Sequence, residues 1–207
     1  MRTLITEFIK MADMTEEDDA LLMGRLCAGD DLALNALMLR WKGPLLGFMR
    51  RYVADPEEAL DLAQETFVRV YQARERFNPS MKFSTWLFAI AANLCKNHLR
   101  WVARHPKVSL DDSGAGESDS FLPRNDPADG GDHPDADLLR KERAEHVRRA
   151  IHQLPHEQKT ALILYEYEGL PTAQIARVSG CSAKAVENRI ARARQSLRKL
   201  LGKFLNQ

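Results

Sequence analysis

The feature that most constrains the fold of this chain is a break in composition between residues 109 and 137. Ser109–Asp137 contains nine acidic residues against one basic residue, together with four glycines and three prolines. Its only sizeable apolar residues are Leu110, Phe121 and Leu122. Such a segment cannot bury enough apolar surface to offset the entropy of an ordered chain. We therefore predict a flexible acidic linker over residues 108–137, with a separately folded part on either side.

The charge is unevenly distributed along the chain. The 207 residues include 30 Lys and Arg against 29 Asp and Glu, a net charge of +1. Because Ser109–Asp137 has a net charge of −8, the remaining residues carry +9. The body of the protein is therefore basic, and such a body attracts anions, the phosphates of nucleic acid among them.

Both flanking parts show apolar residues at helical spacing, and neither shows the two-residue alternation of a strand. We therefore predict an all-α fold with two small helical domains, over residues 14–107 and 138–207. The apolar fraction of 44% suits a soluble globular chain, and no apolar run is long enough to span a bilayer. Three scattered cysteines argue against a disulfide framework. These features predict a cytoplasmic protein without membrane insertion.

Punctuating residues mark the helices expected in the first domain. Gly43-Pro44 predicts a kink or a short break, because proline removes a helical hydrogen bond. Asp55-Pro56 predicts the start of a further helix. The inner face of that helix is expected to contain Leu60, Ala63, Phe67, Val70 and Tyr71, and the outer face Asp61, Gln64, Glu65 and Arg69.

The stretch from Phe77 to Pro106 combines an aromatic loop with a basic helix, for which Ser84 or Thr85 is the expected N-cap. Helical spacing directs Leu87, Ile90, Ala91 and Leu94 toward a core, and places Asn93, Lys96, Asn97, Arg100 and Arg104 on another stripe. Such a surface can follow a phosphate backbone while offering π-faces to bases. A solvated basic face with its aromatics in the core explains the same residues, and the stretch alone does not decide between the two.

Pro155 and Gly169 delimit a helix in the second domain. Pro155 ends the preceding helix and can start this one, and Gly169 can stop it. The residues expected to be buried are Ala161, Leu162, Leu164 and Tyr165.

Pro171–Arg194 has the layout of a DNA-reading helix-turn-helix. Gly180 is placed to adopt positive φ at the turn, and Ser182 to cap the second helix. Helical spacing directs Val186, Ile190, Ala193 and Leu197 inward, and Ala183, Lys184, Glu187, Asn188, Ala191, Arg192 and Gln195 outward. Seven basic residues against one acidic residue from Lys184 onward favour phosphate contact. The same layout also serves protein docking, so a plain amphipathic hairpin remains an alternative.

Two segments of the first domain, Asp61–Phe67 (DLAQETF) and Phe83–Asn93 (FSTWLFAIAAN), together resemble region two of bacterial RNA polymerase sigma factors. Leu154–Arg194 resembles region four of the same family. A short linker stands in place of the extra folded domain of housekeeping sigma factors, which is the layout of the extracytoplasmic-function (ECF) subfamily. The resemblance covers residues 18–104 and 138–201.

The resemblance implies a sigma factor that docks on the clamp of core RNA polymerase, traps melted minus-ten DNA and reads the minus-thirty-five duplex. The implied polymerase-binding residues are Asp61, Gln64 and Glu65. The residues implied for minus-ten DNA are Phe77, Phe83, Trp86, Asn93, Lys96, Asn97, Arg100 and Arg104. Those implied for the minus-thirty-five duplex are Ala183, Lys184, Glu187, Asn188, Arg189, Ala191 and Arg192. The implied partners are core RNA polymerase, double-stranded and melted promoter DNA, and an anti-sigma factor.

Two positions depart from the family pattern. Pro171 stands where many relatives have a serine that can cap the first helix of the motif. Glu187 occupies a position that is often basic in relatives, so the duplex sequence read here is expected to differ.

The sequence contains no glycine-rich phosphate loop, nucleophile elbow or HExxH motif, so we expect no enzymatic activity and no cofactor. Cys95 and His98 are two potential metal ligands on one helical face. A buried cysteine and a surface histidine explain this pair better, so we predict no metal site.

Two rival functions remain open from the sequence. A conventional repressor or activator with a helical sensor domain would bind its operator without polymerase. A helical protein-interaction module would use its basic faces on an acidic partner and would show no promoter dependence.

Overall fold

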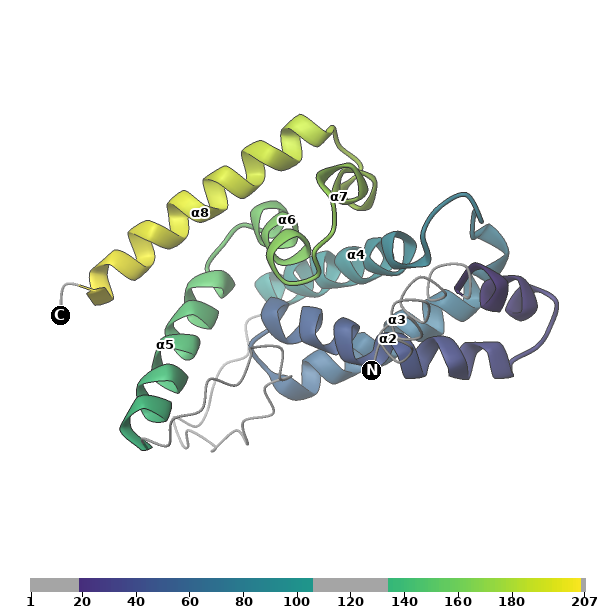
Figure 1. The fold of residues 1–207 in the computed structure, drawn as a ribbon, viewed down its shortest axis with the longest axis horizontal. Coiled ribbons are helices and arrows are strands. Elements are labelled where there is room, and N and C mark those ends of the chain that lie inside the picture. Colours follow the sequence, from purple (N-terminus) through teal and green to yellow (C-terminus); the bar gives the residue numbers. More distant parts are fainter. Residues whose placement is uncertain (1–18, 106–133, 206–207) are drawn as a thin grey trace, which may run out of the picture.

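The computed structural model describes residues 19–105 and 134–205, and every regular element in these two ranges is helical (Figure 1). Residues 19–27 are helical, and a turn follows at Ala28 and Gly29, where the φ of Gly29 is 94°. Helix α2 spans Leu32–Tyr52 and helix α3 spans Pro56–Gln72. The short 3₁₀ helix η1 spans Arg74–Arg76, and helix α4 spans Phe83–Arg104. The helices α5, α6, α7 and α8 span Pro134–His152, His156–Glu166, Thr172–Ser179 and Ala183–Leu205. The predicted all-α fold is confirmed.

We call residues 19–105 the N-terminal group and α5–α8 the C-terminal group. In the first, α3 and α4 pack against each other and against α2; in the second, α5, α6 and α7 all pack against α8. Helix α5 begins at Pro134, so residues 134–137, predicted as the end of the linker, are helical. The predicted linker residues 108–133 and the predicted domain start at residue 14 lie outside the described residues.

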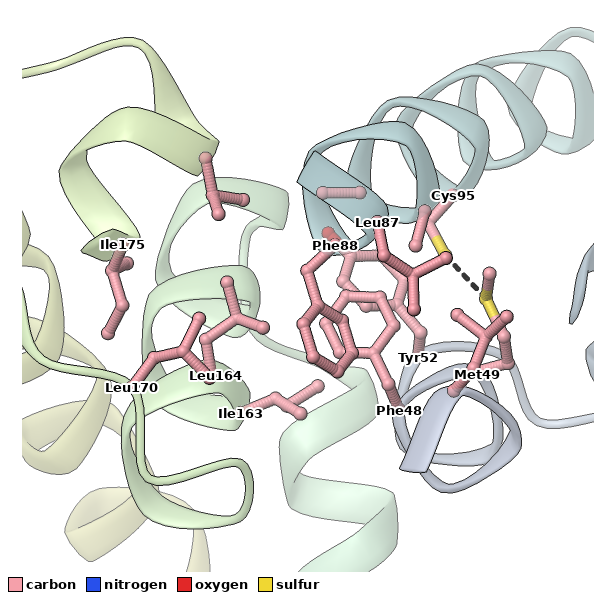
Figure 2. Close-up of a cluster of buried hydrophobic side chains, with 14 of the residues drawn as sticks. Phe48, Met49, Tyr52, Leu87, Phe88, Cys95, Ile163, Leu164, Leu170 and Ile175 are labelled. Carbon is pink, nitrogen blue, oxygen red and sulfur yellow. Dashed lines mark hydrogen bonds between the residues drawn. The ribbon is translucent and has the colours of Figure 1, made fainter. Parts of the chain in front are cut away.

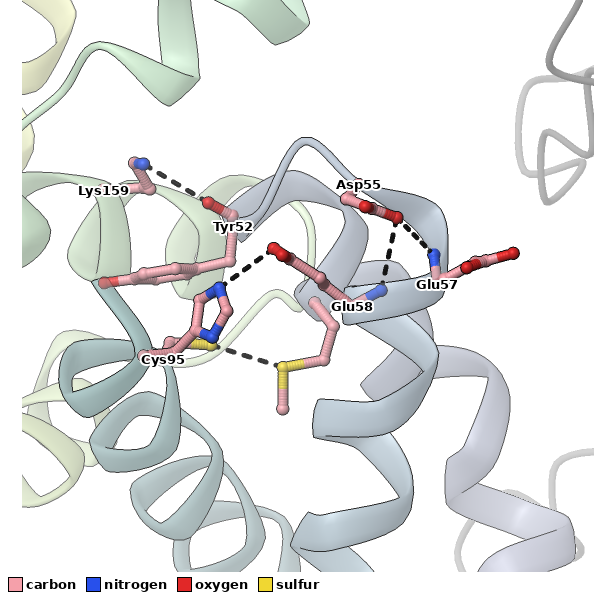
Figure 3. A network of polar contacts seen from close by, with 8 residues as sticks. Tyr52, Asp55, Glu57, Glu58, Cys95 and Lys159 are labelled. Carbon is pink, nitrogen blue, oxygen red and sulfur yellow. Dashed lines mark hydrogen bonds and ion pairs between the residues drawn. The ribbon is translucent and has the colours of Figure 1, made fainter. Parts of the chain in front are cut away.

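The start of α3 follows from the two residues predicted to form it. The Asp55 side chain accepts hydrogen bonds from the backbone N–H groups of Glu57 at 2.8 Å and Glu58 at 3.4 Å (Figure 3). Pro56 takes the first helical position, where a missing N–H costs no hydrogen bond. The predicted helix start at Asp55-Pro56 is confirmed.

Helix α2 continues through Gly43-Pro44. Of the two predicted alternatives, a kink or a short break, the short break is therefore wrong. An interior proline costs about 3 kcal/mol, whereas burial of one large apolar side chain contributes about 1.5–3 kcal/mol. Leu37 before the proline, and Leu45 and Phe48 after it, are all fully buried. Their burial in one core offsets the lost hydrogen bond and keeps the helix continuous.

Helix α4 begins at Phe83, earlier than the predicted N-caps Ser84 and Thr85. Lys82 is the N-cap, with an extended backbone and no capping side-chain hydrogen bond. Phe83 is 3% exposed and Thr85 is buried beside it. Burial of the Phe83 ring, rather than a hydroxyl cap, therefore accompanies this helix start.

The two helical groups share one apolar core. Phe48 of α2 packs against Tyr52 and against Phe88 of α4, with ring centroids 5.4 Å apart in each pair. Ile163 and Leu164 of α6 belong to the same buried cluster (Figure 2). In Figure 1, α6 lies between α8 and the N-terminal group. The cores of the two predicted domains are thus continuous.

The middle of helix α6 is buried on all sides. Its six consecutive residues Lys159–Leu164 are buried, whereas an amphipathic surface helix buries one face only. The predicted burial is confirmed for Ala161, Leu162 and Leu164. Tyr165, in contrast, is 40% exposed, and Ile163 is fully buried without having been predicted. The difference arises because α6 packs against both α2 and α8.

Buried polar groups orient α6 on α2. The Tyr52 hydroxyl shares a hydrogen bond with Thr160 Oγ1 at 2.8 Å, donates to the His156 carbonyl at 3.1 Å and contacts His156 Nδ1. The buried Lys159 ammonium donates to the carbonyls of His152 at 3.0 Å and Tyr52 at 3.4 Å (Figure 3). Burial raises the pKa of Tyr52 and lowers the pKa of Lys159. Hydrogen bonds are directional, so this network favours one orientation of the two groups.

A second contact between the groups contains a carboxyl group with a shifted pKa. The Arg51 guanidinium of α2 lies over the Tyr167 ring, 4.0 Å from its centroid. Burial raises the pKa of the neighbouring Glu168 to about 7, and the Arg51 charge opposes this rise without cancelling it. At pH 7 the Glu168 carboxyl is therefore protonated in about half of the folded molecules.

We expect Glu168→Gln to stabilise the protein at pH 8 and to have little effect at pH 5. The protonated carboxyl contributes fully to stability below about pH 4.5, and this contribution is lost as the pH rises through about 7. Glutamine stays uncharged at every pH. Thermal denaturation between pH 5 and pH 8 measures the gain, expected to be on the order of 1–3 kcal/mol in the free energy of unfolding at pH 8.

The control for this prediction is Glu75→Gln, which replaces an exposed carboxylate. It should leave the pH profile of stability unchanged. If Glu168→Gln and the wild-type chain gave the same pH profile, the carboxyl group would be ionised in the folded protein and the inferred shift would be wrong.

Candidate nucleic-acid interface

The outer face of α3 presents the three polar residues predicted there. Asp61 and Gln64 are exposed. Glu65 is partly exposed and accepts a hydrogen bond from Arg69 Nε at 2.8 Å. Because residues three and four apart are neighbours on a helix, these side chains form one acidic and amide face.

Two exposed apolar residues, Leu60 and Val68, flank this acidic and amide face. Neither was predicted to lie there. Leu60 is 47% exposed and Val68 is 48% exposed, so the predicted inward position of Leu60 is wrong. The buried residues of α3 are Ala59, Ala63, Thr66, Phe67 and Val70. Leu60 lies at the edge of this stripe, about 100° of rotation from Ala59 and about 20° beyond Phe67. Its four-residue spacing to Gln64 and Val68 is the signal that could have placed it outside.

The aromatic residues before and within α4 pack mainly against one another. Phe77 lies 5.3 Å from Trp86 and 6.2 Å from Phe83 between ring centroids. Phe83 also packs against Trp41 of α2, at 6.0 Å. Phe77 and Trp86 are half-buried, whereas Phe83 lies in the core. The buried Phe83 ring is therefore placed to support the loop rather than to stack on a base.

The solvent-facing side of α4 carries two parallel rows of polar residues. Asn93 and Asn97 are exposed and lie one turn apart. The neighbouring row consists of Lys96, which is half-buried, and the exposed Arg100 and Arg104. The structure thus brings together the five polar residues predicted on this helix.

The basic row of α4 approaches the C-terminal group. Burial, followed by the positive charge of Lys96, lowers the pKa of His156 at the start of α6 to about 4, and Arg100 acts in the same direction. Helix α4 also packs against α7, where Thr85 Oγ1 donates a hydrogen bond to Gln174 Oε1 at 3.4 Å. This proximity could not be read from the sequence, because the two groups are separated by the predicted linker.

The helix-turn-helix is formed by α7 and α8. Gly180 adopts the left-handed conformation with φ 60° and ψ 39°, as its position at the turn predicts. Ser182 Oγ accepts a hydrogen bond from the Ala185 N–H at 3.2 Å, which confirms it as the cap of α8. The predicted inward residues are buried or half-buried: Val186, Ile190, Ala193 and Leu197.

The outward residues of α8 form an exposed face with one exception. Those exposed are Ala183, Lys184, Glu187, Asn188, Ala191, Arg192 and Gln195. Lys184 Nζ lies 2.9 Å from Glu187 Oε2, so these two charges partly offset each other. Arg189 is half-buried instead, 2.7 Å from Glu157 Oε2 and 3.0 Å from Cys181 Sγ.

A cavity of about 410 Å³ lies between the start of α6 and α8. Asn188, Arg189 and Arg192 line it from α8, and His156 and Glu157 line it from α6. Two of the residues predicted to read duplex DNA, Asn188 and Arg192, therefore border a hollow rather than a flat surface.

Cys95 and His98 have partners other than a metal ion. The buried Cys95 thiol donates to Met49 Sδ at 3.3 Å, and burial raises the pKa of this thiol (Figure 2). His98 Nε2 lies 3.0 Å from Glu58 Oε2. Among residues 19–105 and 134–205, no group of three or more His, Cys, Asp or Glu is placed to hold a metal ion. Over the same residues, no helix combines the length and apolarity that crossing a bilayer requires.

Comparison with known proteins relates both helical groups to one family. Residues 37–105 match the model of Sigma-70 region 2, and residues 144–197 match the model of Sigma-70, region 4. The first match contains α4 and most of α2, and the second contains the helix-turn-helix.

Curated relatives align over almost the whole chain. The RNA polymerase sigma-H factor of Pseudomonas aeruginosa is 37% identical over 197 residues, which cover 94% of this chain and 99% of that protein. The ECF RNA polymerase sigma-E factor of Escherichia coli is 33% identical over 184 residues, which cover 86% of this chain and 92% of that protein.

Solved structures of similar fold cover most of the chain. CnrH, in complex with the cytosolic domain of CnrY, has a TM-score of 0.64 and 25% identity, covering 90% of this chain and 98% of CnrH. The sigma factor RpoE, in complex with the anti-sigma factor NepR from Bartonella quintana, has a TM-score of 0.60 and 24% identity. That match covers 81% of this chain and 96% of the RpoE chain. On the strength of its near-complete alignment with these sigma factors, the chain belongs to the bacterial RNA polymerase sigma factors of the ECF subfamily.

Proposed function

We propose that this sigma factor directs core RNA polymerase to promoters through three surfaces, one each on α3, α4 and α8. The observation that carries the proposal is the pairing of amide and basic rows on α4 with an exposed helix-turn-helix face on α8. One surface suits melted DNA and the other suits a duplex. A repressor that reads an operator needs only the second.

The outer face of α3 is the proposed polymerase-docking surface. Asp61, Gln64 and Glu65 provide acceptors and an amide, and the exposed Leu60 and Val68 add apolar area at its ends. Exposed apolar residues beside polar groups are typical of protein interfaces. The interface on the polymerase is therefore expected to be basic with an apolar part.

The loop before α4 and the exposed side of α4 form the proposed minus-ten surface. The exposed turn Asn78–Ser80 is held by a hydrogen bond from the Ser80 N–H to Asn78 Oδ1 at 2.9 Å. Phe77 and Trp86 support this loop, and Asn93 and Asn97 offer amide edges to a flipped base. Flipping costs a few kcal/mol, and stacking of one base returns about 1–3 kcal/mol.

The exposed side of α8 is the proposed minus-thirty-five surface, with Asn188 and Arg192 as the principal base-reading residues. Asparagine pairs with adenine and arginine with guanine in the major groove, each pairing giving about 1–3 kcal/mol of discrimination. Arg189 is assigned to holding α8 against α6, because its guanidinium is occupied by Glu157.

Simultaneous use of both DNA surfaces requires the two helical groups to separate. The two promoter elements lie about 25 base pairs, or about 85 Å, apart along the duplex. A compact chain of this length has a radius of gyration of about 17 Å. Extended, the linker residues 108–133 that precede α5 reach about 90 Å. We therefore propose the domain division 14–107, 108–137 and 138–207, with the contacts of Tyr52 and Arg51 open on the promoter.

We further propose that an anti-sigma factor controls this protein in the cytoplasm. The similar CnrH chain is bound to the cytosolic domain of CnrY in its solved structure. The proposed role includes no catalysis by this chain, since RNA synthesis belongs to the polymerase.

Transcription in vitro with purified core polymerase on a genomic promoter pool tests the proposed function. The folded chain, free of any inhibitor, should yield transcripts from a limited set of promoters, and core polymerase alone should not. A pool without any promoter-specific transcript would reject the sigma function. Tight binding to a DNA site without polymerase would favour a repressor or activator.

We expect Leu60→Ser to weaken binding to core polymerase roughly fivefold or more, because it removes exposed apolar area from the docking face. Its thermal stability should stay unchanged, since Leu60 is outside the core. Titration of labelled polymerase measures the affinity. Leu32→Ser, at an exposed leucine of α2, is the control. Equal affinities for the two variants would contradict the assignment.

We expect Asn93→Ala to slow open-complex formation about 5- to 100-fold, the range that corresponds to losing one base contact. Binding to core polymerase should remain intact, because Asn93 lies on α4 and not on the α3 face. Permanganate footprinting on a recovered promoter measures strand opening. The exposed Asn35→Ala serves as the control, and an unchanged opening rate in Asn93→Ala would remove Asn93 from the proposed site.

A further inference from the structure

The last turns of α4 carry an exposed tryptophan that none of the proposed surfaces includes. Trp101 is 48% exposed, although tryptophan is highly buried on average. It lies one helical turn beyond Asn97, which lies one turn beyond Asn93. The exposed amide row of α4 therefore continues into an exposed aromatic residue.

His105 holds the indole in a defined orientation. The two rings stack with centroids 5.0 Å apart and planes inclined by 25°. His105 Nδ1 also lies 3.0 Å from the Trp101 carbonyl oxygen, a hydrogen-bond distance. Because Trp101 already rests against the imidazole, it loses little rotamer freedom when a ligand covers its remaining surface.

Cations stand beside this aromatic pair. Arg100 precedes Trp101 in the chain, and Arg104 follows one turn after Arg100 in the basic row. Arg104 Nε donates to the Arg100 carbonyl at 3.2 Å, which keeps its guanidinium along the same helix. A π-face beside phosphate-binding cations is the combination with which proteins hold single-stranded nucleic acid. A protein partner would also cover the indole, but it would not require continuity with the Asn93 row.

We propose that Trp101 stacks on an unpaired base of promoter DNA at the edge of the melted segment and so prolongs the open complex. This inference rests on the proposed minus-ten function. Trp101 is eight residues beyond Asn93, or about 12 Å along the helix. Stacked nucleotides are about 3.4 Å apart. A distance of about 12 Å corresponds to three or four nucleotides, which is the expected separation between the base at Trp101 and the base at Asn93.

The experiment uses holoenzyme on fork-junction DNA built from a promoter that the pool transcription recovers. 2-Aminopurine replaces, one at a time, the unpaired bases near the base whose capture depends on Asn93. Trp101→Ala should raise the fluorescence of a probe about three or four nucleotides away and shorten the open-complex lifetime about 5- to 100-fold. Trp101→Phe should keep the probe fluorescence and the open-complex lifetime close to those of the wild-type protein, because phenylalanine keeps a π-face.

The matched control is Tyr165→Ala on α6. Tyr165 is 40% exposed and lies beside a cation, with the Arg194 guanidinium 5.5 Å from its ring, but it is not on α4. This variant should leave both the probe fluorescence and the lifetime unchanged. Thermal denaturation checks that each variant is folded. If Trp101→Ala is not folded, the comparison of Trp101→Phe with Trp101→Leu decides, since leucine fills space without a π-face.

Several results would overturn the inference while leaving the sigma function in place. One is that Trp101→Ala has the same open-complex lifetime and the same probe fluorescence as the wild-type protein, while the wild-type protein transcribes normally. Another is a Trp101→Ala variant that binds core polymerase more weakly in the absence of DNA, which would make Trp101 a contact to the polymerase. Trp101→Leu behaving like Trp101→Phe would exclude stacking. In contrast, absence of promoter-specific transcription with wild-type protein would reject the proposed function itself.

Discussion

The arrangement of both helical groups depends on α6, a short helix whose middle is buried on all sides. Its six consecutive buried residues Lys159–Leu164 pack in the core that contains Phe48 and Phe88. A helix with one apolar face can be covered by its own domain, whereas a helix buried all round needs neighbours on opposite sides. The N-terminal group supplies α2 on one side, and the C-terminal group supplies α8 on another. Covering α6 therefore brings together helices that are far apart in the chain.

The polar groups within this interface make the packing specific. Tyr52 and Lys159 are buried, yet each has hydrogen-bond partners, so neither is left unsatisfied. Apolar packing alone tolerates small rotations, but an unmade buried hydrogen bond costs about 1–3 kcal/mol. The Arg51–Tyr167 contact lies closer to solvent and beside the carboxyl of Glu168. An interface of this composition suits groups that must hold together in one state and separate in another.

The exposed positions of the residues proposed to contact DNA were predictable wherever one helix determines which side a residue faces. The rows of Asn93 and Arg100 on α4, and the face of Asn188 on α8, follow from a period of 3.6 residues and from local caps. Arg189 and Phe83 were assigned by position in a motif, and the structure gives both other surroundings. Glu157 neutralises Arg189 from a different helix, a pairing that spacing within α8 cannot reveal. Trp101 was absent from the prediction because an apolar residue on a helix is normally read as core.

The sequence by itself determined the helices, their caps at Asp55 and Ser182, the left-handed turn at Gly180 and the outward faces of α4 and α8. These are local properties, since each depends on residues within a few positions. Only the tertiary structure decided that α2 continues through Pro44 and that the middle of α6 is buried on all sides. It also decided that the two cores are continuous. The physical reason is that burial depends on which helices meet in space, and a composition break such as Ser109–Asp137 conceals which helices those are.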